Sequence, residues 1–175
     1  MSYDLHLFRV PAGTDPIDAY RHWQDEEEKK AIAAEGEQRN VLNQEQYQQM
    51  QKIADSLKSN WSAFTQFQPE QPLPWIELDD EDLQVQVMIQ PDSVEITMPY
   101  FRDRAGEMMA LAAKCIKIVT QETGFLAYDP QLERLVTESD LSGMQSQYRE
   151  MDRHLPDIVQ RGAGSNPARP WWRFW

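Results

Sequence analysis

The sequence predicts an α+β fold, in which a mainly antiparallel sheet containing a three-strand meander packs with about four helices. Two patterns support this. Between positions 75 and 98 apolar residues recur at every second position, which is the period of strands, and on both sides of this region they recur every three or four positions, which is the period of helices. A length of 175 residues with 41% hydrophobic residues suits a single core. A doubly wound parallel sheet is the weaker alternative, because strands and helices do not alternate regularly.

The first predicted elements are a strand and a surface helix. Aromatic and branched residues from Tyr3 to Val10 indicate a strand that ends at the turn signal Pro11-Ala12-Gly13. A helix is expected from residue 17 to residue 34, because Thr14-Asp15-Pro16 is a helix-start signal and Gly36 a stop signal. This helix has few apolar residues, so we expect it on the surface, with the helices covering one face of the sheet.

An amphipathic helix and the meander are expected next. Asn43 is a plausible cap for a helix whose apolar side is formed by Tyr47, Met50, Ala54, Leu57, Trp61 and Phe64. After three prolines the period changes, and strands are predicted at 75–78, 83–89 and 94–98. The turns that join them are expected at Asp79-Asp80-Glu81-Asp82 and Gln90-Pro91-Asp92-Ser93.

The last third of the domain is predicted to contain its most apolar helix. Residues from Met108 to Val119 share an apolar face, and Gly124 follows where a C-terminal glycine belongs. A short strand is expected at 125–128, with 132–136 as its candidate neighbour, and a final helix is expected from its cap at Ser139 to Pro156. We expect one domain over residues 1–159 and a flexible, aromatic-ended tail over residues 160–175.

Charge and cysteine content limit the classes of partner. The chain has 17 basic and 29 acidic residues and a net charge of -12, which repels phosphate backbones and anionic headgroups, so neither a nucleic acid nor a membrane is expected as a partner. A single cysteine excludes an intramolecular disulfide. No signal segment or long apolar run is apparent, and the predicted location is cytoplasmic.

Motif searches predict no catalytic residues, no metal and no cofactor. The glycines do not form a phosphate-binding loop, no serine elbow occurs, and Cys115 lies on the apolar side of a helix where burial suppresses reactivity. His22 and Glu26 have helical spacing, but they are better explained as a solvated pair than as metal ligands. His6 is expected to face solvent or the edge of the helical layer. The rival hypothesis is a small hydrolase or transferase with a nonstandard site built from Asp129, His6 and a carboxylate of the first helix.

Acidic runs favour a protein-binding function. Ten acidic and two basic residues lie between Glu70 and Glu107. An acidic surface would steer a basic partner and fix specificity, while the alternative is that the charges only solvate turns and helices. The expected centre of the surface is the run of Asp79, Asp80, Glu81 and Asp82, and the second candidate is the run of Asp25, Glu26, Glu27 and Glu28.

The C-terminal end carries four large rings in five residues. We expect Trp171, Trp172, Phe174 and Trp175 to dock on the chain's own domain, because a loose aromatic tail would be an exposed apolar patch. The alternative is a linear motif offered to a partner, since Trp and Arg dominate interface hot spots.

Three segments carry a resemblance to known proteins. The opening MSYDLHLF (1–8), the stretch TGFLAYDPQ (123–131) and the ending RPWWRFW (169–175) resemble small bacterial proteins, some of which are similar to immunity proteins of interbacterial toxin systems. The resemblance covers less than a fifth of the chain and transfers no active-site residue. It implies a binding role, and together with the acidic charge it predicts a non-enzymatic protein that neutralises a basic toxin effector by binding it.

Overall fold

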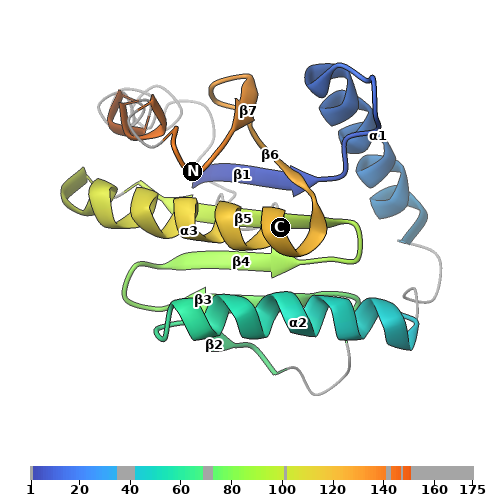
Figure 1. Cartoon of the computed structure of the whole chain (residues 1–175), viewed down its shortest axis with the longest axis horizontal. Coiled ribbons are helices and arrows are strands. Elements are labelled where there is room, and N and C mark those ends of the chain that lie inside the picture. Colours follow the sequence, from blue (N-terminus) through green and yellow to red (C-terminus); the bar gives the residue numbers. More distant parts are fainter. Residues whose placement is uncertain are drawn as a thin grey trace, which may run out of the picture.

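A computed structural model describes residues 2–34, 42–68, 73–100, 102–140, 143–146 and 148–150 of the chain. Within these residues the strands form one seven-stranded antiparallel sheet in the order β2-β3-β4-β5-β1-β6-β7, so the predicted α+β class is confirmed (Figure 1). The strands are β1 (Ser2–Phe8), β2 (Thr65–Gln66), β3 (Ile76–Asp80), β4 (Val85–Ile89), β5 (Ser93–Pro99), β6 (Leu126–Asp129) and β7 (Arg134–Val136). The helices are α1 (Pro16–Ala34), α2 (Gln44–Asn60), α3 (Ala105–Thr123) and the short 3-10 helix η1 (Arg102–Arg104), and residues 143–146 and 148–150 are also helical.

The predicted meander is confirmed in β3, β4 and β5, and β1 is an interior strand of the sheet, between β5 and β6. β1 pairs with β5 on one side, where Leu5 is opposite Ile96, and with β6 on the other, where Leu7 is opposite Ala127. The predicted pairing of β6 with β7 is also confirmed. The two-residue strand β2 was not predicted; it extends the sheet beyond β3.

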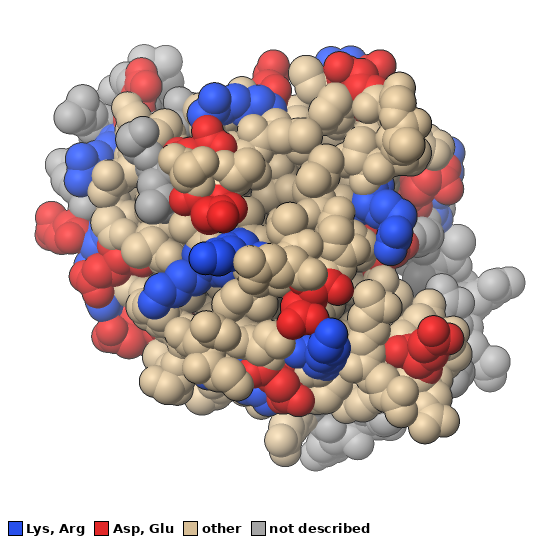
Figure 2. All heavy atoms as spheres, viewed as in Figure 1, with Lys and Arg blue, Asp and Glu red and all other residues tan. Residues whose placement is uncertain are grey.

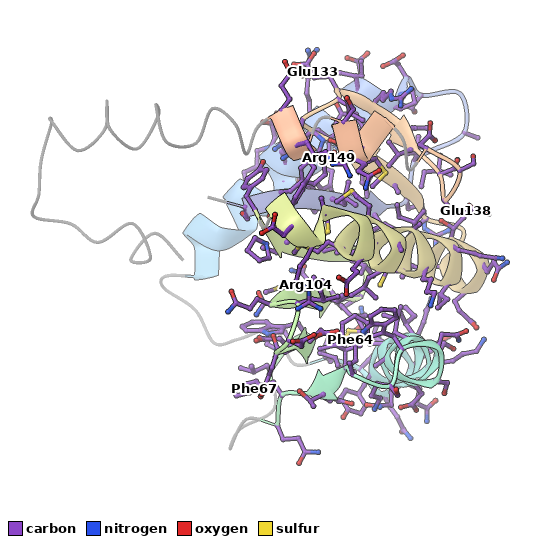
Figure 3. The ribbon with its side chains drawn as sticks, turned by 90° about the vertical axis from the view of Figure 1, so that its left-hand side faces the viewer. Phe64, Phe67, Arg104, Glu133, Glu138 and Arg149 are labelled. Carbon is purple, nitrogen blue, oxygen red and sulfur yellow. The ribbon has the colours of Figure 1, made fainter. Side chains whose placement is uncertain are left out.

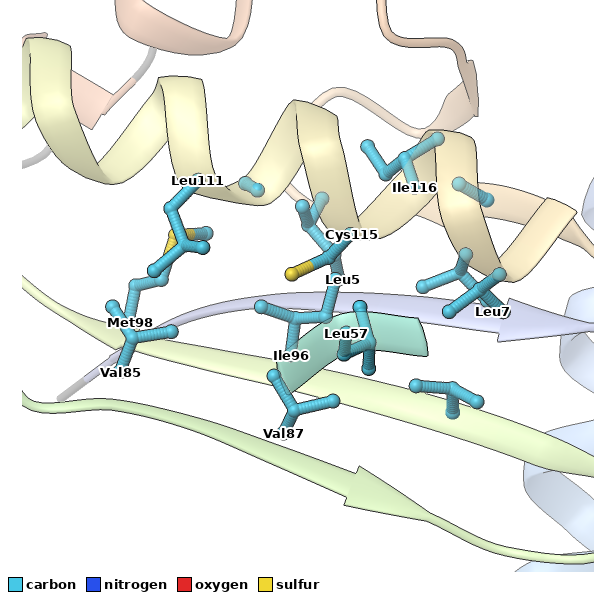
Figure 4. Packing of buried hydrophobic residues seen from close by; sticks show 14 of the residues in the cluster. Leu5, Leu7, Leu57, Val85, Val87, Ile96, Met98, Leu111, Cys115 and Ile116 are labelled. Atoms are coloured by element: carbon cyan, nitrogen blue, oxygen red, sulfur yellow. The ribbon is translucent and has the colours of Figure 1, made fainter. Parts of the chain in front are cut away.

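Helices α2 and α3 cover one face of the sheet, which we call the core face. Inward residues of the strands interdigitate with the apolar sides of both helices (Figure 4), and α3, which was predicted to be the most apolar helix, is the more buried of the two. Leu5, Ile96 and Val87 are 0% exposed, as is Leu111 of α3. This layer is the hydrophobic core of the domain and contributes most of its stability.

The first helix lies on the surface, as predicted, but the sheet is not covered on one face only. α1 lies on the side opposite α2 and α3, against the β1–β6–β7 end of the sheet (Figure 3). Its Tyr20 ring stacks on Tyr128 with a centroid separation of 4.1 Å and joins a second apolar cluster with Phe8 and Ala19. A few aromatic residues therefore anchor this mostly exposed helix to the sheet.

Helix ends explain two correct predictions and one wrong one. Asn43 forms a capping box with Gln46, and Gly124 ends α3 with a φ of 72°, a left-handed conformation that glycine adopts without strain. Ser139 is not a cap. The amide of Met144 donates to the carbonyl of Asp140, so the last described helix begins after Asp140.

The predicted domain end at residue 159 and the tail over 160–175 lie outside the described residues, as do Trp171, Trp172, Phe174 and Trp175. Among the helices of the described ranges, none is long and apolar enough to span a bilayer.

Candidate functional site

The side of the sheet opposite α2 and α3 carries four carboxylates, which we call the acidic face: Asp4, Glu77, Asp79 and Glu95. Successive side chains of a strand point to opposite sides, so the alternation that buries Leu78 and Ile96 turns these residues to the other side. Each of the four is half-buried. Two adjacent rows of cross-strand neighbours hold them.

The strand register fixes both rows. In the first row, Glu77 pairs with Met88, Met88 with Glu95, and Glu95 with His6. In the second row, Asp79 pairs with Gln86, Gln86 with Thr97, and Thr97 with Asp4. Side chains that are opposite or diagonal in such rows lie within reach of one another, so the carboxylates form one surface across β3, β4, β5 and β1.

Asp4, Glu77 and Asp79 accept hydrogen bonds, and none of the four carboxylates of the acidic face forms an ion pair with the side chains that the structure describes. Ser2 Oγ donates to Asp4 Oδ2 at 3.0 Å, and Gln86 Nε2 donates to Glu77 Oε1 at 2.8 Å and to Asp79 Oδ1 at 3.4 Å. Glu95 and the other three acids take part in none of the salt bridges of the described residues. Four negative charges are thus gathered without a compensating cation in the described part of the chain.

Burial and mutual repulsion act on the protonation of these groups. Burial raises the pKa of Asp4 above its usual value, and the pKa of Glu95 is raised by burial and by the neighbouring Asp4 charge. The pKa of Glu77 is also raised, by burial and then by Asp79. A bound cation would relieve both effects, because it would supply the missing opposite charge.

Aromatic side chains border the acidic face where α1 crosses the sheet. His6 is half-buried between Tyr20 and Trp23 of α1, with centroid separations of 5.5 and 5.2 Å, so of the two expected positions it occupies the one beside a helix and does not face solvent freely. Burial lowers its pKa to about 4, and its Nδ1 atom has no hydrogen-bond partner. The imidazole is therefore neutral near pH 7 and does not compensate Glu95.

Charges on the side of α2 and α3 are arranged differently. There Lys52 Nζ lies 2.6 Å from Glu122 Oε2 and Lys58 Nζ lies 3.0 Å from Asp55 Oδ1. Figure 2 shows this side, with basic and acidic side chains interspersed. The acidic face differs from it in having carboxylates without basic neighbours among the described side chains.

The acidic run from Asp79 to Asp82 is split by the structure, because β3 extends through Asp80 and only Glu81 and Asp82 belong to the turn. Asp79 lies on the acidic face. Asp80 is only 2% exposed and points to the core side, where its carboxylate accepts hydrogen bonds from Trp61 Nε1 at 2.6 Å and from the Leu83 amide at 2.9 Å. Asp80 is thus a structural residue, and its assignment to an exposed binding turn is wrong.

The other two members of the run remain exposed. Asp82 Oδ2 pairs with Arg104 Nη2 at 2.8 Å, which already neutralises part of its charge, whereas Glu81 points into solvent beside the acidic face. Of the four residues, Asp79 and Glu81 are therefore the ones available to a partner.

The second predicted run lies on α1. Asp25 is exposed, and Glu26 Oε1 pairs with Lys29 Nζ at 2.7 Å. Glu27 is half-buried, and the side chain of Glu28 lies outside the described part of the structure. The partner-binding role of this run stays a prediction.

The rival catalytic site is not assembled. Asp129 is 0% exposed on the core side, where it accepts hydrogen bonds from the Tyr3 hydroxyl and from the backbone amides of Gln131 and Leu132. His6 points to the opposite side of the sheet, as its register partner Tyr128 does. The sheet therefore separates the two side chains that this site would need to bring together.

The described residues contain no arrangement that supports a cysteine nucleophile or a metal site. Cys115 is 1% exposed, and burial raises the pKa of its thiol to about 12. Among the residues with described positions, no group of three or more His, Cys, Asp or Glu is arranged to hold a metal ion.

A shallow hollow of about 530 Å³ lies at the β2 end of the acidic face. Its wall includes Thr65, Phe67, Asp79, Gln86 and Thr97. Phe67 is 51% exposed and points away from α2, whereas Phe64 is buried on the α2 side (Figure 3). The acidic face thus has an aromatic edge.

Comparisons with known proteins identify no relative: no family model, no curated protein and no solved structure matches this chain.

Sequence reasoning missed three of the four carboxylates of the acidic face. Asp4, Glu77 and Glu95 are single acids inside strands, and they are less conspicuous than an acidic run. The strand alternation around Glu77 and Glu95 contained the signal, since both occupy polar positions between buried residues. Asp4 joins them only through the pairing of β1 with β5.

Proposed function

We propose that this protein is a non-enzymatic binding protein that neutralises a basic partner protein, a toxin effector, through the acidic face. The observation that carries the proposal is the set of four half-buried carboxylates without basic partners among the described side chains. Lysine or arginine side chains of a partner would supply the missing charges, accelerate association and fix its orientation.

The energetics of the face favour a binding role over a structural one. Half-burying a carboxylate without an opposite charge lowers the stability of the fold, and an amide or hydroxyl side chain at the same position would avoid this loss. Sites that lower stability in this way are typical of functional surfaces, where the interaction with a ligand compensates the loss.

Two further observations support the class of partner. The net charge of -12 disfavours nucleic acid and anionic membranes as ligands and favours a basic protein. Three segments resemble small bacterial proteins, some of which are similar to immunity proteins of interbacterial toxin systems, and this resemblance favours a toxin as that protein. A cytoplasmic location belongs to the same proposal, and the single, buried thiol supports it.

The experiment compares two variants of equal charge. In the face variant the four carboxylates are replaced by their amides: Asp4→Asn, Glu77→Gln, Asp79→Asn and Glu95→Gln. In the control variant four exposed acids elsewhere are replaced: Asp18→Asn, Glu45→Gln, Asp103→Asn and Glu138→Gln. The partner is captured from the native cells with the unmodified protein, identified by mass spectrometry and purified.

Association rates with the purified partner then decide the proposal. We expect the face variant to associate at least about tenfold more slowly at low salt, with a difference that shrinks as salt rises, while the control variant stays close to the unmodified protein. Equal rates for the two variants would show that the acidic face is not the binding surface. A third variant with the α1 acids neutralised tests Asp25, Glu26, Glu27 and Glu28 in the same way.

A further inference from the structure

The hollow at the β2 end of the acidic face combines two recognition features. Phe67 presents an exposed ring at its rim, and the backbone amide of Phe67 donates to the carbonyl of Glu77, which places this ring beside the first row of the acidic face. Asp79 and Glu81 supply carboxylates to the same wall. A ligand that fits such a site carries large apolar rings and positive charges in alternation.

The chain itself contains a segment with this chemistry. Residues 169–175 read Arg-Pro-Trp-Trp-Arg-Phe-Trp, with four aromatic rings, two arginines and no acid, and they lie outside the described residues. We propose that this C-terminal segment docks in the hollow of its own chain, with its rings against Phe67 and its arginines on the carboxylates of the acidic face. The inference rests on the proposed function, because it makes the segment a competitor of the basic partner for one surface.

The last described residues make this docking reachable. The hydroxyl of Tyr148 donates to the carbonyl of Pro99, and the Tyr148 ring lies 5.7 Å from the Tyr3 ring, so the chain passes the end of β5 two residues before its described part ends at residue 150. Thr97, in the same strand, lines the hollow. The 19 residues from 150 to 169 can span roughly 60 Å, and a domain of this size is roughly 30 to 40 Å across.

Docking of this kind is expected to be reversible. Aromatic rings gain apolar contact with Phe67, and the arginines gain opposite charges in a partly desolvated setting. The conformational entropy that the linking residues lose on docking opposes both gains. A basic partner that makes more contacts can therefore displace the segment. Only partners that bind the acidic face more strongly than the segment does are then expected to bind.

The test measures proximity in the intact chain. Because Cys115 is buried and its thiol pKa is raised to about 12, a cysteine introduced by Ala168→Cys can be labelled selectively with a nitroxide in the folded protein. The expected result is strong paramagnetic broadening of the amide signals of Gln66, Gln86 and Thr97, around the hollow. The amides of Lys52 and Ser56 in α2, on the opposite side, are the internal reference and should change little.

Charge variants test the proposed contacts. Arg169→Gln together with Arg173→Gln should reduce the broadening around the hollow several-fold, and Glu77→Gln with Asp79→Asn should do the same. Arg149→Gln is the matched control, because this arginine is exposed and lies before the segment. A control variant that reduces the broadening as much as the double arginine variant would contradict the assignment.

Two other results would overturn the inference. Absence of broadening around the hollow would show that the segment does not dock there. Equally strong broadening in a mixture of spin-labelled protein without ¹⁵N and ¹⁵N-labelled protein without a spin label would show docking on a second copy. Neither result bears on the association rates of the face variant with the partner, so failure of this inference and failure of the proposed function are distinguishable.

Discussion

The same strands form both the core face, which is packed against α2 and α3, and the acidic face on the opposite side of the sheet. On β5, Ile96 is 0% exposed against the helices, while its neighbour Glu95 is half-buried on the acidic face without a basic partner among the described side chains. On β3, Leu78 and Asp79 have the same relation. Because alternate residues point to opposite sides, stability and recognition can be changed almost independently within one strand.

The largest expected effect is the loss of stability when a side chain on the core side of the sheet is truncated. Ile96→Ala removes a fully buried side chain between β1 and β4 and should lower the free energy of unfolding by about 2–5 kcal/mol. Urea denaturation measures the change. Thr97→Ala, one residue on and on the other side of the sheet, is the control and should change stability by about 0.5 kcal/mol or less. Similar losses in both variants would contradict the division between the two sides.

The next largest expected effect is a difference in stability between variants of two neighbouring residues of the acidic run, Asp80 and Asp79. Asp80→Ala leaves Trp61 Nε1 and the Leu83 amide without their acceptor and should cost about 1–3 kcal/mol of stability. Asp79→Ala, on the acidic face, should change stability by about 0.5 kcal/mol or less. Chemical denaturation of the two variants side by side is the measurement, and an Asp79 variant as unstable as the Asp80 variant would refute the assignment.

Acid sensitivity should distinguish His6 from exposed histidines. Burial lowers the pKa of His6 to about 4, so between this value and the ordinary value of about 6.5 the unfolded chain binds the proton more readily, and stability falls as pH falls through that window. His6→Gln should remove a pH-dependent loss on the order of 1–3 kcal/mol. Urea midpoints at pH 7, 5.5 and 4.5 measure it. Exposed His22→Gln is the control, and an unchanged pH dependence in the His6 variant would argue against the burial of its ring.

The smallest expected effect is a gain in stability when Glu95 is replaced by its amide. The pKa of Glu95 is raised by burial and by Asp4, so the folded state holds its proton more tightly, and stability falls as pH rises from the ordinary carboxyl range through the raised value. Glu95→Gln should therefore raise the free energy of unfolding at pH 7 by about 0.5 kcal/mol, and the gain should vanish below about pH 4. Thermal unfolding at both pH values is the check, with Glu45→Gln as the control. A loss of stability at pH 7 would mean that Glu95 has a stabilising partner.

Local patterns were sufficient to predict most elements. The alternation around β4 and β5, the cap at Asn43 and the stop at Gly124 all depend on residues close in sequence, and each is present in the structure. The seven-stranded order could not be predicted, because it depends on β1 inserting between β5 and β6, which are distant in sequence. The short strand β2 has too few residues to produce a period.

The candidate site was harder to predict than the fold for a related reason. Asp is disfavoured in strands, so the run from Asp79 to Asp82 was interpreted as a turn, whereas pairing with Val85 keeps Asp80 in β3. Whether a charged residue in a strand faces helices or solvent depends on which side the helices occupy. The acidic face became visible only once the register aligned Asp4, Glu77, Asp79 and Glu95 in two rows.

The position of β1 between β5 and β6 also determines when the sheet can be completed during synthesis. Phe8 pairs with Ser93 and Leu126, so the ribosome makes this strand long before either neighbour exists. Until then its apolar side chains and both of its backbone edges lack their native partners, and contacts of such long sequence separation slow folding. The nascent chain therefore passes through a stage in which an apolar, edge-exposed segment is prone to intermolecular pairing, and folding in the presence of a chaperone should give a higher yield of native protein than folding without one.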